Sequence, residues 1–343
     1  MRQKSKMVST IVGMLLSLAI VLSGCGGGQA KQEPASTSGD KSAIGSQSST
    51  EAAKTGGVGN AEKEYTVKHA MGSTTIKGTP KRVVVLTNEG TEAALSLGIK
   101  PIAIVKAWGM DLIYQHLTEK LKDVTIIGDE NQPNLELIAT LKPDLILGNK
   151  LRQEKVYEQL SRIAPTVFSE RINGDWQINY KLYAEALNKK EEGDAEFAKF
   201  ESKVSGLRTK LGDKINTAVS IVRFNPGGIV RIYYNDTFSG VLLKKIGLKR
   251  PAVQDQNKFA DDVAKERIPD MEGDILFYFT YDNEKGEAVK AEQEWQKDPL
   301  WNNLNVVKKG KVHKVYDGIW NSSGGIVSAN LMLDDLEKYL LKN

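Results

Sequence analysis

The feature of this 343-residue sequence that most restricts its fold is a pattern that occurs twice, 130 residues apart. Residues 136–147 and 266–277 both begin with glutamate and carry an aspartate at the ninth position, followed by an apolar run. Ile138 in the first copy corresponds to Ile268 in the second. Each copy predicts a short helix, a break and a buried strand that the aspartate opens. A unit repeated at this separation indicates two lobes built on one plan.

Apolar runs and helical patterns alternate on both sides of the repeat. The run at 82–87 is followed by a helical pattern from Thr91 to Leu97, which stops at Gly98. Further strands are predicted at 101–106, 144–148, 218–224, 229–234, 274–279 and 311–315, and further helices at 134–143, 237–246, 287–296 and 325–341. Continuous apolar runs are typical of strands covered on both faces. The predicted fold class is therefore α/β, with two lobes of mostly parallel sheets.

One segment between the two halves has a clear helical period. Its apolar residues recur at intervals of three and four: Phe197, Phe200, Val204, Leu207 and Leu211. A helix over 191–211 is about 30 Å long at 1.5 Å per residue, enough to bridge two lobes. We therefore predict an N-terminal lobe over 64–190, a bridging helix over 191–213 and a C-terminal lobe over 214–343. The pattern alone is also compatible with an ordinary surface helix.

The first 25 residues have the pattern of an export signal. Three basic residues precede an uncharged run over 7–22, and Cys25, the only cysteine, closes a Leu-Ser-Gly-Cys tetrapeptide. The run is too short for a comfortable transmembrane span. The tetrapeptide resembles the bacterial lipobox, which implies removal of residues 1–24 and a diacylglyceryl group on Cys25. The alternative is a structural or reactive thiol behind a membrane helix, and a single cysteine forms no intrachain disulfide.

Residues 25–63 are predicted to form a tether between the lipidated Cys25 and the lobes. Gly, Ser, Ala, Thr, Lys and Glu dominate it, and only Ile44 and Val58 are large aliphatic residues, so it cannot bury a core. As a flexible coil it spans about 35 Å. We expect the lobes on the extracytoplasmic face of the cell membrane, held by the lipid. A lipoprotein held outside a single membrane favours a Gram-positive envelope. A lipobox also permits a periplasmic location.

The charge of the chain argues against a nucleic-acid partner. Signal removal takes three positive charges from a formal net charge of +4 and leaves +1. The rest of the chain has no basic block with interleaved aromatic residues. We therefore expect no binding to DNA or RNA.

Side chains that follow the predicted strands form the candidate ligand site, because ligands of open α/β sheets bind at the carboxyl ends of strands. They are Trp108, Lys150, Arg152, Arg171 and Trp176 in the first lobe, and Arg223, Arg231, Tyr233, Tyr281 and Trp320 in the second. Guanidinium groups pair with carboxylate or hydroxamate oxygens, and aromatic faces cover apolar arms of a ligand. The set predicts a large, oxygen-rich, anionic ligand. Ordinary packing is the alternative for the tryptophans, and a solvated charge for each basic residue.

Catalysis and direct metal binding are both disfavoured. The sequence contains no Gly-x-Ser-x-Gly elbow, phosphate-binding loop, His-Glu-x-x-His motif or Gly-x-Gly-x-x-Gly loop. Its three histidines, His69, His116 and His313, form no cluster with metal-ligand spacing. We therefore expect no catalytic residue, no resident metal and no cofactor. A bare-metal importer, an extracytoplasmic enzyme and an adhesive surface module are the alternatives from other classes.

Three segments together resemble the solute-binding lipoproteins of ABC importers for iron-siderophores and corrinoids. They are Pro80-Lys-Arg-Val-Val-Val-Leu, the region from Gly128-Asp to Asn134-Leu-Glu-Leu-Ile-Ala-Thr-Leu-Lys-Pro, and the region from Asp298-Pro-Leu-Trp to His313-Lys-Val. The resemblance covers the chain beyond its tether. It implies two lobes bridged by a rigid helix. It also implies that Glu136 and Glu266 dock onto arginines of a permease dimer, although a glutamate near a helix N-terminus is explained equally by the helix dipole.

The resemblance also implies a function. We expect a monomeric, lipid-anchored receptor that captures a ferric siderophore of the hydroxamate or citrate/carboxylate type between its lobes. It would deliver this ligand to an ABC permease dimer, whose ATPase supplies the energy. The iron would arrive already bound by its chelator. A corrinoid or haem is the alternative ligand within the same family, and the arginines at the strand ends favour the anionic chelate.

Overall fold

The computed structural model describes residues 63–341. The predicted signal peptide, Cys25 and the tether up to residue 62 lie outside this range. A search of the described residues finds no helix that is both long and apolar enough to cross a membrane.

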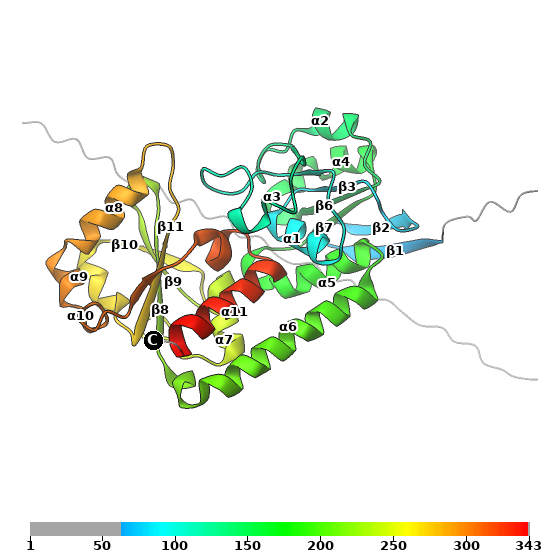
Figure 1. Ribbon diagram of the computed structural model, residues 1–343. Helices are drawn as coiled ribbons and strands as arrows, with labels where there is room; N and C mark the ends of the chain where they lie inside the picture. Colours follow the sequence, from blue (N-terminus) through cyan, green and yellow to red (C-terminus); the bar gives the residue numbers. More distant parts are fainter. Residues whose placement is uncertain (1–62, 342–343) are drawn as a thin grey trace, which may run out of the picture. The chain divides into compact units, whose positions relative to one another are not determined.

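The described chain begins with an antiparallel hairpin of β1 (Glu64–His69) and β2 (Gly72–Lys77). The next five strands form the all-parallel sheet of the N-terminal lobe, in the order β5-β4-β3-β6-β7. They are β3 (Val83–Val85), β4 (Ala103–Ile104), β5 (Thr125–Ile126), β6 (Leu145–Asn149) and β7 (Thr166–Ser169) (Figure 1). Every residue of β3, β6 and β7 is buried, as expected for strands covered on both faces.

The helices of this lobe begin where polar side chains cap them. They are α1 (Asn88–Ser96), α2 (Leu135–Thr140), α3 (Lys150–Gln153), α4 (Tyr157–Ile163) and α5 (Trp176–Ala186). Thr87 accepts a hydrogen bond from the N–H of Gly90, and Asn134 accepts one from the N–H of Leu137. These bonds satisfy N–H groups that the first turn of a helix leaves free. They therefore fix the first turns of α1 and α2.

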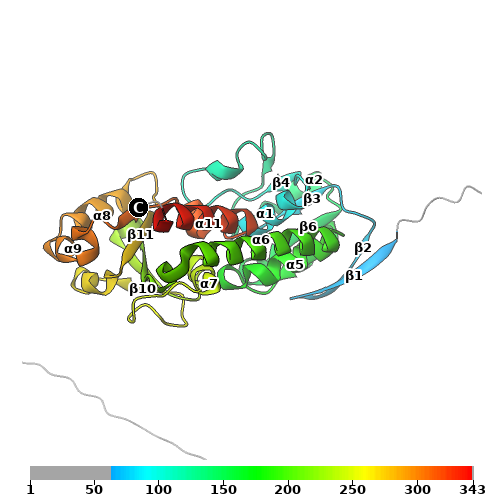
Figure 2. The same cartoon turned by 60° about the horizontal axis from the view of Figure 1, so that its bottom comes forward.

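The long helix expected over 191–211 is α6 (Lys190–Leu211). Its buried side chains include Phe200, Val204, Leu207 and Leu211, which are four of the five predicted apolar positions. It contacts α5, α7 (Phe238–Ile246) and α11 (Ile326–Leu341), and Figure 2 shows α5, α6 and α11 side by side. The described residues fall within one compact unit, and one apolar cluster contains side chains from both lobes and from α6.

The sheet of the C-terminal lobe is mixed, in the order β10-β9-β8-β11-β12. Its strands are β8 (Val219–Phe224), β9 (Val230–Tyr233), β10 (Ala260–Val263), β11 (Ile275–Thr280) and β12 (Val312–Lys314). Strands β8, β11 and β12 are parallel, whereas β9 is antiparallel to β8 and β10. The five-residue connection from β8 to β9 is too short for a parallel crossover, and Gly227 and Gly228 turn it with φ of 75° and 72°. Helices α8 (Glu287–Gln296), α9 (Pro299–Asn303) and α10 (Asn305–Lys308) complete the lobe.

The sequence repeat has the same structural role in both sheets. Asp144 accepts hydrogen bonds from the backbone N–H groups of Lys81 and Arg82 at 2.8 and 2.9 Å, just before β3. Asp274 accepts one from Ala218 at 2.8 Å, just before β8. In each sheet the repeated strand, β6 or β11, pairs in parallel with the strand its aspartate contacts. The predicted common plan of the two lobes is confirmed.

The helical part of the repeat differs between the copies. The first copy forms α2, whereas the second forms a 3₁₀ segment, Lys265–Met271. Pro269 lies inside this segment and has no N–H to donate to an α-helical hydrogen bond. The expected short helix therefore exists in both lobes but has a tighter form in the second.

Candidate ligand-binding site

A cavity of about 430 Å³ is lined by both lobes. The N-terminal lobe contributes Glu89, Trp108, Glu130, Asn131, Arg152 and Ile172. The C-terminal lobe contributes Arg223, Asn225, Arg231, Tyr233, Phe259, Tyr281 and residues 321–324. Most of these residues follow the carboxyl end of a strand, which is where the sequence rule places a ligand site.

Six of the ten predicted side chains meet in this cavity: Trp108, Arg152, Arg223, Arg231, Tyr233 and Tyr281. The other four, Lys150, Arg171, Trp176 and Trp320, are not among the residues that line it. The site therefore draws its predicted arginines and aromatic rings from both lobes.

Strand pairing sets two arginines side by side on one face of the second sheet. Arg223 of β8 and Arg231 of β9 are cross-strand partners. Residues two positions apart on a strand share a face, so Tyr233 lies on the same face as Arg231. Like charges directly opposite each other are destabilising unless anionic groups surround them. This pair therefore places two guanidinium groups on one wall of the cavity.

Arg223 is held in place by several neighbours. Its guanidinium pairs with Asp317, at 2.8 Å from Nε to Oδ1 and 3.1 Å from Nη2 to Oδ2. It also donates to the Tyr233 hydroxyl at 3.1 Å and to Ser322 Oγ at 3.0 Å, and it lies 4.6 Å from the Tyr281 ring centre. Burial alone would lower the pKa of Arg223, but Asp317 and Tyr233 outweigh burial and raise it. The Arg223 guanidinium therefore stays cationic although it is almost completely buried.

Arg231 is more open to solvent than Arg223. Its Nε donates to Asp262 Oδ1 at 2.5 Å, and about a third of its side chain is exposed. This hydrogen bond raises the pKa of Arg231. Tyr233 packs against Phe259 with ring centres 5.4 Å apart, which adds an apolar surface beside the guanidinium. Charge and apolar area thus lie next to each other on this wall.

The wall of the N-terminal lobe combines one arginine with an indole and a buried carboxyl group. The Arg152 guanidinium lies 5.2 Å from the Trp108 ring centre and donates to Asn131 at 3.3 Å. Its Nε is 3.6 Å from Glu130 Oε2. Burial raises the pKa of Glu130, and hydrogen bonds from Asn88 and the charge of Arg152 act in the opposite direction. Arg152 is thereby oriented by both its charge partner and its aromatic neighbour.

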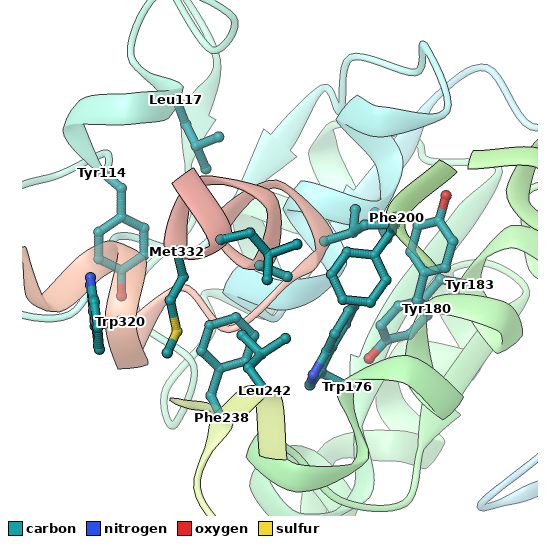
Figure 3. Packing of buried hydrophobic residues seen from close by; sticks show 14 of the residues in the cluster. Tyr114, Leu117, Trp176, Tyr180, Tyr183, Phe200, Phe238, Leu242, Trp320 and Met332 are labelled. Carbon is teal, nitrogen blue, oxygen red and sulfur yellow. The ribbon is translucent and has the colours of Figure 1, made fainter. Parts of the chain in front are cut away.

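Two of the predicted tryptophans belong to the core and not to the cavity wall. Trp176 is 1% exposed and packs against Phe200 and Phe238, with ring centres 5.3 and 5.8 Å away (Figure 3). Trp320 is fully buried, and its ring centre lies 4.5 Å from that of Phe277 in a tilted arrangement. Its Nε1 donates to Asp335 at 2.8 Å. Both positions follow strands, but the neighbouring helices cover their rings. Packing, the alternative considered for these residues, is what the structure shows.

The two remaining basic candidates point to local partners. Lys150 Nζ lies 3.0 Å from Glu170, and Arg171 Nε lies 2.9 Å from Asp175. Both are surface ion pairs, which contribute little to stability. Both residues are therefore solvated surface charges, which was the alternative interpretation of the basic candidates.

Sequence reasoning missed the acidic part of the wall. Glu89 and Glu130 line the cavity, and both are more than nine-tenths buried. They follow β3 and β5, so the rule about strand ends applied to them as well. They were missed because only basic and aromatic residues were taken as candidates. A buried carboxyl group in a cavity is a stronger functional signal than an exposed basic group.

The two repeat glutamates lie on the surface. Glu136 is in the first turn of α2 and Glu266 in the first turn of the 3₁₀ segment, and both are exposed. Among residues 63–341, neither glutamate side chain makes a hydrogen bond or ion pair. They are free to contact another molecule.

Comparison with known proteins agrees with this architecture. Residues 83–316 match the family model described as periplasmic binding protein. A Bacillus subtilis protein named "Probable siderophore-binding lipoprotein YfiY" is 52% identical over 294 residues, covering 82% of this chain and 90% of that protein. The Fe(3+)-citrate-binding protein YfmC of the same organism is 30% identical over 345 residues, covering 98% of each chain.

A solved structure of a binding protein is also similar to this chain. Staphylococcus aureus SirA complexed with staphyloferrin B has a TM-score of 0.73 and 36% identity, covering 80% of this chain and 98% of that one. The enzyme hypothesis is therefore set aside in favour of a binding protein. By the family match and by its identity with these relatives, this chain belongs to the periplasmic binding protein family.

Proposed function

We propose that this protein is a lipid-anchored receptor that binds a ferric siderophore in the cavity between its lobes and delivers it to an ABC permease. The observation that carries the proposal is the pairing of Arg223 with Arg231 on one wall, opposite Arg152 and Trp108 on the other. The cavity volume of about 430 Å³ lies within the range of small-molecule sites.

The chemistry of the walls supports an anionic, oxygen-rich ligand. Guanidinium groups bind carboxylate and hydroxamate oxygens with two parallel hydrogen bonds. Trp108, Tyr281 and Phe259 supply apolar faces for the organic arms of the chelate. The names of similar proteins refer to siderophores, Fe(3+)-citrate and staphyloferrin B, and they support a ferric siderophore over a corrinoid or haem. Iron is cargo in this proposal, bound by its chelator and not by protein side chains.

The partners in the proposal follow from exposed features of the two lobes. Glu136 and Glu266 are assigned to contact the permease dimer, because they are equivalent in the repeat and exposed in both lobes. A permease that spans two lobes would need one such contact on each. The protein would act as a monomer, with its lipid on Cys25 at the extracytoplasmic face of the membrane. The word lipoprotein in the name of the 52% identical relative supports that anchor.

Tryptophan fluorescence of the full chain in detergent micelles tests the proposal. The panel is ferric citrate, ferric staphyloferrin B, a ferric hydroxamate, a ferric catecholate, haem and cobalamin. Trp108 lies in the cavity, so we expect saturable quenching by a ferric carboxylate or hydroxamate, and Trp108→Phe should remove much of the signal. Quenching by haem or cobalamin alone would contradict the siderophore assignment. Absence of binding to the whole panel would contradict the receptor function.

A further inference from the structure

Glu89 is the one carboxyl group of the cavity wall without a cationic neighbour. It is 7% exposed, and its Oε1 accepts a hydrogen bond from Asn179 Nδ2 at 2.8 Å, with the Tyr183 hydroxyl at 3.4 Å. In the part of the chain that the structure describes, Oε2 has no hydrogen-bond partner. No basic side chain there lies within ion-pair distance of Glu89. Glu89 therefore lines the cavity with a buried carboxyl group, one oxygen of which has no partner among the described residues.

The charged groups around Glu89 are mostly paired or acidic. On its own helix, Glu92 lies 3.0 Å from His116. The other titratable groups near it are Glu130 with Arg152, Asp175 with Arg171, and the Tyr183 phenol, and across the cavity Arg223 with Asp317 and Arg231 with Asp262. Gly325 and Ile326, at the start of α11, line a small pocket with Glu89 and do not titrate. The Tyr180 phenol of α5 lines the same pocket and accepts a hydrogen bond from Ser96. Nothing in this set neutralises a negative Glu89.

Burial and the nearby Glu130 therefore favour the neutral form of this acid. Burial is the larger cause and Glu130 the next, and together they raise the pKa of Glu89 well above its ordinary value. The hydrogen bonds from Asn179 and Tyr183 act in the opposite direction but are outweighed. Burial also raises the pKa of Glu130, but hydrogen bonds from Asn88 and the charge of Arg152 oppose this rise.

The neutral form of Glu89 matters for the ligand because the other charges around the cavity are already paired. Each of the three arginines already has a carboxylate partner: Arg152 with Glu130, Arg223 with Asp317, and Arg231 with Asp262. An ionised Glu89 would add an unpaired negative charge, which repels an anionic chelate. A neutral Glu89 removes that repulsion and offers an O–H donor from Oε2.

We propose that Glu89 is a specificity-determining residue of the cavity, which enters the complex as a neutral acid and donates a hydrogen bond from Oε2 to an anionic oxygen of the chelate. This inference rests on the proposed function and deepens it. The ligand selected would present a carboxylate, hydroxamate or alkoxide oxygen to the wall formed by α1. A cationic group at the same place would be selected only if Glu89 were ionised.

Thermal unfolding without ligand tests the neutral acid. A group with a raised pKa in the folded state contributes stability that is fully present below its pKa in the unfolded chain, near 4.5, and lost as pH rises through its folded-state pKa. Glutamine cannot titrate, so the Tm of Glu89→Gln minus that of the wild type should grow between pH 4.5 and pH 8. We expect a change of about 3 °C or more in this difference. A difference independent of pH would overturn the proposal.

Calorimetric titration tests the hydrogen bond to the ligand, with ferric citrate and ferric staphyloferrin B as probes. Wild-type affinity should fall, by about tenfold in all, as pH rises and Glu89 ionises. Glu89→Gln, whose Oε1 can accept from Asn179 while Nε2 donates to the chelate, should keep its affinity at pH 9. Glu89→Ala should bind about tenfold more weakly than Glu89→Gln at every pH.

Glu292→Gln is the matched control. Glu292 is also 7% exposed, but it bonds Lys314, Tyr278 and Thr280 and is not part of the cavity wall. This variant should follow the wild-type pH dependence of binding. If Glu89→Gln loses affinity with pH as the wild type does, the inference about Glu89 is wrong while the receptor function stands. If neither probe nor any other chelate of the panel binds the wild type, the proposed function fails and this inference fails with it.

Discussion

Glu92 of α1 accepts a hydrogen bond at 2.8 Å from the backbone N–H of Ser328 in α11, so a carboxyl group of the N-terminal lobe holds the last helix of the chain. The hydroxyls of Ser323 and Ser328 also donate to Glu92, and His116 Nε2 lies 3.0 Å from it. Glu92 has no exposed surface. Because Ser323 lines the ligand cavity, this cluster joins the core between the lobes to the binding site.

Replacing Glu92 by alanine should therefore destabilise the protein. The change leaves several buried donors without an acceptor, and we expect a loss of about 3 to 5 kcal/mol in the free energy of unfolding. Chemical denaturation measures the loss. Glu136→Ala on the surface serves as the control and should change stability by less than about 0.5 kcal/mol. A loss below about 1 kcal/mol for Glu92→Ala would show that the cluster is not structural.

Arg223→Lys should weaken ligand binding without unfolding the protein. Lysine keeps the positive charge beside Asp317 but loses the planar fork that bonds Asp317, Tyr233 and Ser322 together. We expect the Kd for a ferric carboxylate chelate to rise about tenfold or more, which corresponds to the loss of one charge-assisted hydrogen bond. Titration calorimetry measures it. Arg171→Lys, outside the cavity, is the control, and an equal effect of both variants would contradict the assignment.

The double variant Glu136→Ala, Glu266→Ala should separate uptake from binding. Both side chains are exposed and neither lines the cavity, so the Kd of the chelate should not change. Uptake of radioactive iron by cells that express the variant should fall severely if the glutamates contact the permease. Glu158→Ala, another exposed glutamate in the first turn of a helix, should leave uptake normal. Loss of binding together with uptake would exclude the docking role.

Trp176 and Trp108 should respond in opposite ways to substitution. Trp176→Ala removes a ring that packs against Phe200 and Phe238, and it should cost about 3 to 5 kcal/mol of stability. Trp108→Ala removes a ring that lies beside Arg152 in the cavity, so it should weaken ligand binding with a much smaller loss of stability. Denaturation and calorimetry on both variants measure the two effects. The reverse pattern would contradict the placement of these side chains.

Much of the fold was predictable because its signals are local. The alternation of apolar runs and helical patterns predicted the α/β class, and the period of Phe200, Val204 and Leu207 predicted α6. The repeat predicted equivalent strands, and Asp144 and Asp274 do occupy equivalent positions. The reversal of β9 was not predicted, since it depends on the short turn at Gly227 and Gly228.

The binding site was predictable only in part. The rule that ligands bind at the carboxyl ends of strands accounts for Arg223, which lies near the end of β8. Arg231 reaches the cavity for another reason: β9 is antiparallel to β8, so its amino-terminal end pairs with the carboxyl end of β8. The same rule could not separate Trp108 from Trp176. Both follow strands and differ only in what packs over them, and α6 and α7 close over Trp176.

The sequence by itself determined most of the strands and helices, the repeated plan of the two lobes and the arginine and aromatic candidates for the site, since each depends on residue types at fixed local spacings. Only the tertiary structure decided which side chains line the cavity, because burial depends on contacts between segments distant in the chain. Glu89 shows the difference most clearly. Its position at the start of α1 was local information, but its isolation from every described cation and its closeness to Glu130 arise only when the lobe is folded.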